Sequence, residues 1–229
     1  MSVTKMSSTA PATPSETPVG ILGGTFDPIH KAHLRLAEEA SARFALGRVL
    51  FIPAGHPWHR AAPAAAAADR VAMLRLAIAG NSTFALDDTE VRTEAPGYTV
   101  DTLERLRANF GPQRPLVLLL GADAFLGLAG WHRWQALFDF AHLGVATRPG
   151  HSLLPETMPE ALAKEYRGRL ADPAAAALSP FGLIVPFVLS AGTTSSTMVR
   201  GRLASGAAVG DLLPDCVSDY IRQHHLYTH

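Results

Sequence analysis

Short apolar runs alternate along this chain with stretches in which apolar side chains recur every three or four residues. The apolar runs predict buried strands at 19–22, 48–53, 84–86, 115–120, 142–147 and 183–189, with a weaker candidate at 89–93. The recurring pattern predicts helices over about 34–44, 69–79, 100–109, 160–170, 195–205 and 214–225. Regular alternation of the two patterns indicates an α/β fold with a doubly wound parallel sheet.

Local signals refine this prediction. The run at 115–120 is the most apolar and is typical of a central strand in a parallel sheet. Pro186 cannot donate a ladder hydrogen bond, so the last strand is expected at an edge or a bulge. Thr99 is expected to cap the helix that follows it. The inner face of the 69–79 helix is expected to consist of Val71, Leu74 and Ile78.

The beginning of the chain has a different composition. Residues 1–17 are rich in Ser, Thr and Pro and carry almost no large apolar side chains, so they are predicted to form a disordered tail. Residues 18–229 are predicted to form a single domain. Within it, residues 54–68 are expected to be a mobile loop that leads into a helix.

Composition narrows the class of protein. The 20 basic and 20 acidic residues balance, which argues against a broad surface for nucleic acid or anionic membrane. No apolar run is long enough to span a bilayer, and the N-terminus lacks an apolar signal core. The single cysteine, Cys216, cannot form an internal disulfide. We therefore expect a soluble cytoplasmic protein.

Candidate chemistry is concentrated at the corner between the first strand and the first helix, where residues 23–33 read G-G-T-F-D-P-I-H-K-A-H. Gly23 and Gly24 allow a sharp turn and leave room for a ligand. The helix start carries His30 and His33 where acidic residues are usual, and their spacing places them on one face. Free N–H groups and the positive end of the helix dipole favour a phosphate at such a position.

Two other interpretations of this corner were weighed. The histidines could lie by chance on a surface helix, but the glycine pair, the turn and the histidine pair occur together. A metal site is a weak interpretation, because two histidines without a nearby cysteine are an incomplete ligand set.

The second signal is segment 194–200, which reads T-S-S-T-M-V-R. Several hydroxyls before an apolar helical pattern are typical of an N-cap. Capping does not explain Arg200, a cation in a first turn where the dipole disfavours it. A triphosphate would make this arginine favourable and would use the remaining hydroxyls.

Both segments, in this order, resemble signatures of the nucleotidylyltransferase superfamily, in the version carried by bacterial nicotinate mononucleotide adenylyltransferases. The first differs from the family's H-x-G-H at Ala32, and the second has Thr194 where I-S-S-T-x-I-R has isoleucine. The similarity extends over residues 19 to about 227. It implies a Rossmann-like nucleotidylyltransferase fold and adenylyl transfer from ATP to nicotinate mononucleotide, which forms nicotinate adenine dinucleotide and pyrophosphate in NAD biosynthesis.

The resemblance also implies roles for individual residues. The catalytic set is His30, His33 and Arg200, which would neutralise charge on the leaving pyrophosphate. The implied ATP-binding residues are Gly23, Gly24, Thr25, Phe26, Gly121, Asp123, Arg148, Ser195, Ser196 and Thr197. The implied residues for nicotinate mononucleotide are Thr25, His59, Arg60, Tyr98, Thr99 and Trp131. Mg²⁺ is expected through the substrate phosphates, with no protein metal site, and the protein is expected to be a monomer or a small homo-oligomer.

Plainer interpretations of the same residues remain open. Residues 57–60 could be only an exposed basic loop, Asp123 a helix N-cap and Trp131 a core aromatic. A different acceptor, such as phosphopantetheine or nicotinamide mononucleotide, is a first alternative function. A catalytically silent nucleotide-binding module is a second, and the intact set of His30, His33 and Arg200 argues against it.

Overall fold

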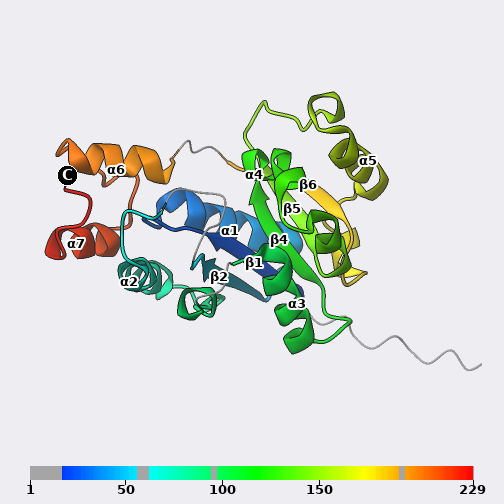
Figure 1. The fold of residues 1–229 in the computed structure, drawn as a ribbon, viewed down its shortest axis with the longest axis horizontal. Helices are drawn as coiled ribbons and strands as arrows, with labels where there is room; N and C mark the ends of the chain where they lie inside the picture. The colour runs from blue at the N-terminus through cyan, green and yellow to red at the C-terminus, as the bar shows by residue number, and fades with distance from the viewer. Residues whose placement is uncertain (1–16, 56–61, 94–96, 191–193, 229) are drawn as a thin grey trace, which may run out of the picture.

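Six parallel strands form one sheet in the computed structural model, which describes residues 17–55, 62–93, 97–190 and 194–228 (Figure 1). The strands are β1 (Val19–Gly24), β2 (Arg48–Pro53), β3 (Phe84–Leu86), β4 (Leu116–Gly121), β5 (His142–Thr147) and β6 (Ile184–Val188). They lie in the order β3-β2-β1-β4-β5-β6, and each neighbouring pair is parallel. This is the strand order of a doubly wound, Rossmann-like fold, as the sequence predicts.

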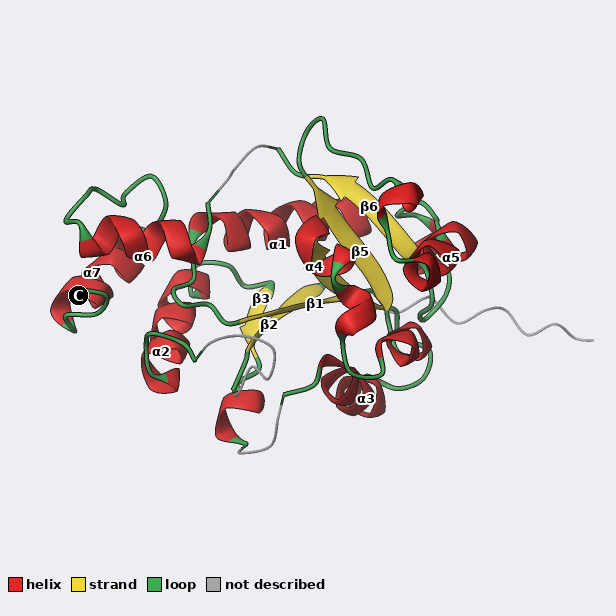
Figure 2. Cartoon of the chain, turned by 45° about the horizontal axis from the view of Figure 1, so that its top comes forward, coloured by secondary structure: helices red, strands yellow, loops and turns green. Residues whose placement is uncertain are grey.

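Helices cover both faces of the sheet (Figure 2). The α-helices of the described residues are α1 (Lys31–Phe44), α2 (Ala67–Ile78), α3 (Thr99–Phe110), α4 (Ala122–Leu126), α5 (Glu160–Arg169), α6 (Ser196–Ala204) and α7 (Asp215–Gln223). Short 3₁₀ helices lie at Glu90–Arg92, Leu128–Gly130, Trp134–Asp139, Pro155–Thr157 and Ala175–Ala177.

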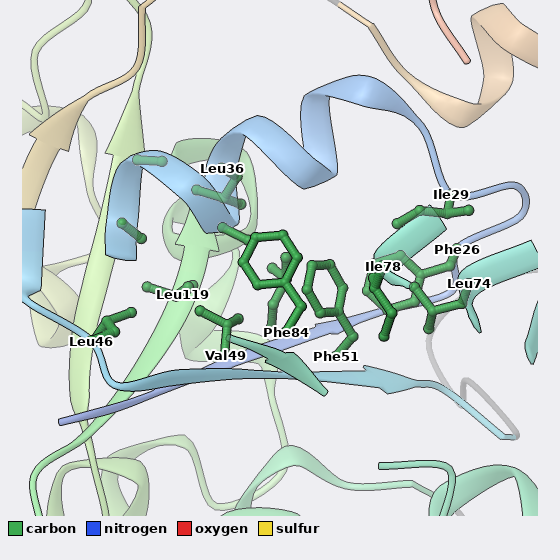
Figure 3. Close-up of a cluster of buried hydrophobic side chains, with 14 of the residues drawn as sticks. Phe26, Ile29, Leu36, Leu46, Val49, Phe51, Leu74, Ile78, Phe84 and Leu119 are labelled. Atoms are coloured by element: carbon green, nitrogen blue, oxygen red, sulfur yellow. The ribbon is translucent and has the colours of Figure 1, made fainter. Parts of the chain in front are cut away.

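Alternation along each strand divides the apolar side chains between two cores. In β2, Val49 and Phe51 face the layer of α1, α2, α6 and α7, whereas Leu50 and Ile52 face the layer of α3, α4 and α5. Figure 3 shows the first core, which reaches the β1–α1 corner through Phe26 and Ile29. The corner is therefore anchored in a packed core on one side.

Several local predictions are wrong, for identifiable reasons. Residues 90–92 form a 3₁₀ helix, so the strand candidate at 89–93 is lost; its β-branched side chains have no neighbouring strand to pair with. Thr99 is the first residue of α3 and does not cap it. In α2 the buried residues are Arg70, Met73, Leu74 and Ile78, so the inner face is rotated from the one expected, and Val71 is only half-buried.

The last strand agrees with its prediction. β6 is an edge strand, as Pro186 indicates. At the other end of the sequence, the Thr17 carbonyl accepts a hydrogen bond from Arg114 Nε at 3.2 Å, so the last residue assigned to the tail contacts the domain. No helix among the described residues is long and apolar enough to cross a membrane.

Candidate active site

β1 and β4 pair over Val19–Ile21 and Leu116–Leu118, and their carboxyl ends lie beyond this register, where the chain changes direction in the sheet. β1 continues through α1 to β2 on one side, and β4 continues towards β5 on the other. Open α/β sheets bind ligands at such a switch point. A Cβ atom added to Gly23 or Gly121, at these strand ends, would meet nothing within 4 Å. The two glycines therefore border open space at this edge.

Phe26 makes the turn from β1 towards α1. Its φ of +48° lies in the left-handed region, which costs a non-glycine residue roughly 1–2 kcal/mol. The side chain is 1% exposed, and its ring packs edge-on against His33 with centroids 5.0 Å apart. Because the ring is buried, a contact between Phe26 and a nucleotide would have to use its backbone. Backbone strain of this kind is concentrated at functional corners.

His30 and His33 stand together at the start of α1. His30 is the N-cap residue, and its backbone N–H donates to His33 Nδ1 at 3.3 Å. The two imidazole rings are stacked, with centroids 3.7 Å apart. The prediction that the two histidines share a face is therefore confirmed. The first turn of α1 has no acidic residue, which leaves its positive dipole end available to an anion.

His30 is a neutral residue in this arrangement. It is 4% exposed, and burial lowers the pKa of its imidazole to about 4. Its Nδ1 atom is buried and has no hydrogen-bond partner among the described residues.

Helix α6 lies beside the same corner (Figure 1). The Ser195 hydroxyl accepts a backbone N–H of the first turn of α6 at 3.2 Å, so the predicted N-cap is confirmed. Ser196 Oγ donates to the Pro28 carbonyl at 3.2 Å, and Arg200 Nη1 donates to the Asp27 carbonyl at 2.7 Å. The two sequence signals, which are 173 positions apart between Asp27 and Arg200, thus meet in space.

Asp27 is a functional candidate that was not among the predicted site residues. It is 4% exposed, and its carboxylate accepts the backbone N–H groups of Ala64 at 2.7 Å and Ala65 at 3.0 Å. The Tyr227 hydroxyl donates to the same carboxylate at 2.7 Å, and Arg200 Nη1 lies 3.7 Å from it. Asp27 therefore joins the corner, the segment before α2, helix α6 and the C-terminal segment.

Arg70 is a second residue that the sequence analysis missed. It lies in α2 with 1% of its surface exposed, and Nη1 donates to the carbonyls of Thr25 at 2.7 Å and Ala54 at 2.9 Å. Burial lowers the pKa of its guanidinium, while the negative charge of Asp27 acts in the opposite direction. Arg70 fixes the chain just beyond the ends of β1 and β2, which carry the corner.

Three of the predicted acceptor residues, Tyr98, Thr99 and Trp131, lie on the α3 side of the sheet. Tyr98 stacks on His132, with ring centroids 4.2 Å apart. Trp131 is half-buried and packs against the core of that face, which confirms a partly exposed ring. Thr99 follows Tyr98 at the start of α3. His132 was not predicted, and its position next to Trp131 in the sequence is the signal that could have found it.

Glu90 contacts the loop after β2 and the loop before α3. Its carboxylate accepts the Thr102 hydroxyl at 2.6 Å, and burial raises its pKa above the usual range. A Cβ on Gly55 would lie 2.1 Å from the Glu90 carbonyl oxygen, and one on Gly97 would lie 2.6 Å from its carboxylate. Glycine is therefore required at position 55, where the close atom belongs to the backbone, whereas at Gly97 the close atom is the end of the Glu90 side chain, which could move.

The remaining predicted residues fall into two groups. One group is exposed near the carboxyl edge of the sheet or at the start of α6: Asp123, Arg148, Ser195 and Thr197. Asp123 does not cap α4, because Gly121 occupies that position. The other group, His59 and Arg60, lies outside the described residues.

The described residues do not form a protein metal site. No group of three or more His, Cys, Asp or Glu side chains among them could hold a metal ion. Asp27, the buried carboxylate at the corner, already accepts hydrogen bonds from Ala64, Ala65 and Tyr227.

Sequence comparisons agree with the geometry. Residues 21–202 match the model of the cytidylyltransferase-like family. A protein of Dechloromonas aromatica named "probable nicotinate-nucleotide adenylyltransferase" is 51% identical over 211 residues, which cover 92% of this chain and 97% of that protein. One of Pseudomonas aeruginosa is 41% identical over 210 residues, covering 91% of this chain and 96% of the relative.

The fold is also similar to that of solved structures. Plasmodium falciparum nicotinic acid mononucleotide adenylyltransferase complexed with NaAD matches with a TM-score of 0.70 and 18% identity, covering 93% of this chain and 98% of that one. The same enzyme complexed with APC matches with a TM-score of 0.66 and 17% identity, over the same shares of the two chains. At these identities the match shows a shared fold.

Proposed function

The chain belongs to the nicotinate-nucleotide adenylyltransferase family, and on that premise we propose that the site at the carboxyl edge of its sheet catalyses adenylyl transfer from ATP to nicotinate mononucleotide. The 5′-phosphate of the mononucleotide attacks the α-phosphorus of ATP. The bond to the β-phosphate breaks, pyrophosphate leaves, and nicotinate adenine dinucleotide forms. This is an adenylyl-transfer step of NAD biosynthesis.

The attacking phosphate is already an anion, so this chemistry needs no general base. The work of the protein is to align the two nucleotides and to stabilise the charge that develops on pyrophosphate. Preorganised donors are effective in this role, and losing one costs roughly 2.7–4 kcal/mol of barrier in comparable anion sites.

The single observation that supports this assignment best is the meeting of Arg200 with the β1–α1 corner through the Asp27 carbonyl. It brings a cation and the start of α6 to the helix start that carries His30 and His33. We assign these two histidines and Arg200 to the phosphates that react. The backbone N–H groups of Gly24 and Thr25, and the Thr25 hydroxyl, complete the set.

We assign the rest of ATP to the carboxyl edge of the sheet, from β1 across β4 to β5. A ribose hydroxyl pair suits the carboxylate of Asp123, and Arg148 follows the end of β5 on the adenine side. The assigned residues along this path are Gly23, Phe26 through its backbone, Gly121, Asp123, Arg148, Ser195, Ser196 and Thr197.

The acceptor is assigned to the α3 side. Trp131 offers a half-buried ring for stacking on the pyridine, and the backbone at Tyr98 and Thr99 offers donors at the start of α3 for the nicotinate carboxylate. Thr25, His59 and Arg60 complete the assignment towards the acceptor phosphate.

Mg²⁺ enters this proposal as part of the nucleotide substrate. When bound to the triphosphate, it would lower the negative charge that the phosphates present to the protein. The cytoplasmic location and the monomeric or small homo-oligomeric state stay predictions.

The test measures pyrophosphate release from ATP and Mg²⁺ with three acceptors: nicotinate mononucleotide, nicotinamide mononucleotide and phosphopantetheine. We expect strong preference for the nicotinate compound. Trp131→Ala should then raise the KM for that acceptor and leave the KM for ATP close to its original value.

Two outcomes would change the proposal. Preference for another acceptor would keep the ATP assignment and remove Tyr98, Thr99 and Trp131 from the acceptor site. ATP binding without pyrophosphate release in the presence of any of the three acceptors would indicate a nucleotide-binding protein without transferase activity.

A further inference from the structure

The C-terminal segment reaches the corner through one side chain. Tyr227 Oη donates to Asp27 Oδ1 at 2.7 Å, across 200 positions of sequence. Tyr227 itself adopts a φ of +60°, in the left-handed region that a non-glycine residue enters at a cost. A strained residue with a buried hydrogen bond suggests more than apolar packing of the chain end.

The Asp27 carboxylate needs this donor. A buried carboxylate must be paired or fully hydrogen-bonded, because removing its charge from water is costly. Oδ2 accepts the N–H of Ala64, and Oδ1 accepts both the N–H of Ala65 and the Tyr227 hydroxyl. The hydroxyl is therefore one of three donors that stabilise the charge of Asp27.

Two arginines surround this carboxylate, and they are held differently. Arg70 is buried and fixed by the carbonyls of Thr25 and Ala54. Arg200 is bonded to the Asp27 carbonyl, but its Nη1 is 3.7 Å from Oδ2 and its side chain is 33% exposed. Arg200 is thus beside the carboxylate without a close ion pair, and its guanidinium stays open to an anion from solvent.

We infer that Tyr227 is a positioning residue for adenylyl transfer: its hydroxyl satisfies Asp27 and so keeps Arg200 available to the phosphates of ATP. Without the hydroxyl, Asp27 Oδ1 loses a donor, and Arg200 is the cation that can move to replace it. A closer Asp27–Arg200 ion pair would then compete with ATP for the guanidinium. This inference rests on the proposed role of Arg200 at the phosphates.

The chain offers a matched control for the inference. Tyr220 lies in α7, and its hydroxyl donates to Asp69 Oδ1 in α2 at 2.9 Å. Tyr220→Phe and Tyr227→Phe each remove one tyrosine–aspartate hydrogen bond from the C-terminal part of the chain. A purely structural role would make the two variants behave alike.

The experiment compares kcat, the KM for ATP, the KM for the acceptor and Tm in wild type, Tyr220→Phe and Tyr227→Phe. We expect Tyr227→Phe to lower kcat/KM for ATP about tenfold, or about 1.4 kcal/mol, with the KM for nicotinate mononucleotide unchanged. Tyr220→Phe should keep the wild-type kinetics. In an Arg200→Ala background, Tyr227→Phe should have no further effect on kcat/KM, because the residue it acts through is gone.

Two results would overturn the inference: wild-type kinetics in Tyr227→Phe, or an equal loss of activity with and without Arg200. Calorimetric titration with ATP alone separates this inference from the proposed function. If the wild type binds ATP but turns over no acceptor, the proposed function fails. The inference then still requires that Tyr227→Phe bind ATP about tenfold more weakly, and that Tyr220→Phe bind it normally.

Discussion

The imidazole planes of His30 and His33 are 17° from parallel, with their ring centroids 3.7 Å apart. Two imidazolium ions could not be stacked this closely without strong repulsion. Because His33 Nδ1 accepts the His30 N–H, that nitrogen carries no proton. Without a bound anion, the two rings are therefore not both protonated. A bound phosphate would favour a positive charge on the pair.

The first prediction concerns proton uptake on ATP binding. Burial holds the pKa of His30 at about 4, and a phosphate close to the ring would raise it. Binding of ATP and Mg²⁺ at about pH 5.5 should then take up a proton. Titration calorimetry in buffers of different ionisation enthalpy measures this uptake directly. His30→Asn, which keeps a good N-cap, should abolish it, and buffer-independent heats in the wild type would contradict the prediction.

The second prediction concerns stability and pH. The folded pKa of His30 is about 4 and the unfolded value is about 6.5, so the unfolded state binds the proton more strongly. The contribution of His30 to stability is present above pH 6.5 and is lost as pH falls towards 4, by up to about 3 kcal/mol. Urea unfolding of wild type and His30→Asn between these pH values should show a difference that shrinks as pH falls. A constant difference would contradict the pKa.

The third prediction concerns Arg70. Replacing it with methionine leaves the carbonyls of Thr25 and Ala54 without their buried donor and removes a cation from beside Asp27. We expect the free energy of unfolding to fall by about 3–5 kcal/mol, as for other broken buried charge pairs. Arg75→Gln, in the same helix, breaks an exposed ion pair with Asp88 and should cost less than about 1 kcal/mol. Similar losses in the two variants would refute a special role for Arg70.

The fourth prediction concerns the loop after β2. Gly55→Ala would place a Cβ 2.1 Å from the Glu90 carbonyl oxygen, which is backbone and cannot rotate away. The loop must shift, and we expect a loss of about 1–3 kcal/mol in stability together with a higher KM for the acceptor. Gly168→Ala in α5 meets nothing within 4 Å and should stabilise the protein by roughly 0.5–1 kcal/mol. Thermal unfolding of the two variants should thus shift in opposite directions.

Sequence patterns located the elements of this fold well where one local signal dominated. The runs at 48–53 and 142–147 match β2 and β5 at both ends, because a short, mainly apolar run between polar turns has few alternatives to a buried strand. The 89–93 segment has similar β-branched residues but no strand partner, and pairing is not visible in a local pattern.

The same contrast holds at the site. The two motifs predicted which residues lie at the corner, since spacing alone puts His30 and His33 on one face. Arg70 was missed because a single arginine in a helical pattern normally faces water, and only the carbonyls of other segments make its burial favourable. Tyr227 was not among the predicted site residues, because a contact with a residue 200 positions away leaves no periodic trace.

The distance in sequence between Asp27 and Tyr227 also bears on how the protein acquires its activity. Contacts this far apart close late, after the local helices and neighbouring strands have formed, because the intervening chain must first be ordered. The sheet can therefore be complete while the corner still lacks Arg200 and Tyr227. After dilution from denaturant, recovery of the circular-dichroism signal should precede recovery of ATP binding, so that catalytic competence reports on the last step of folding.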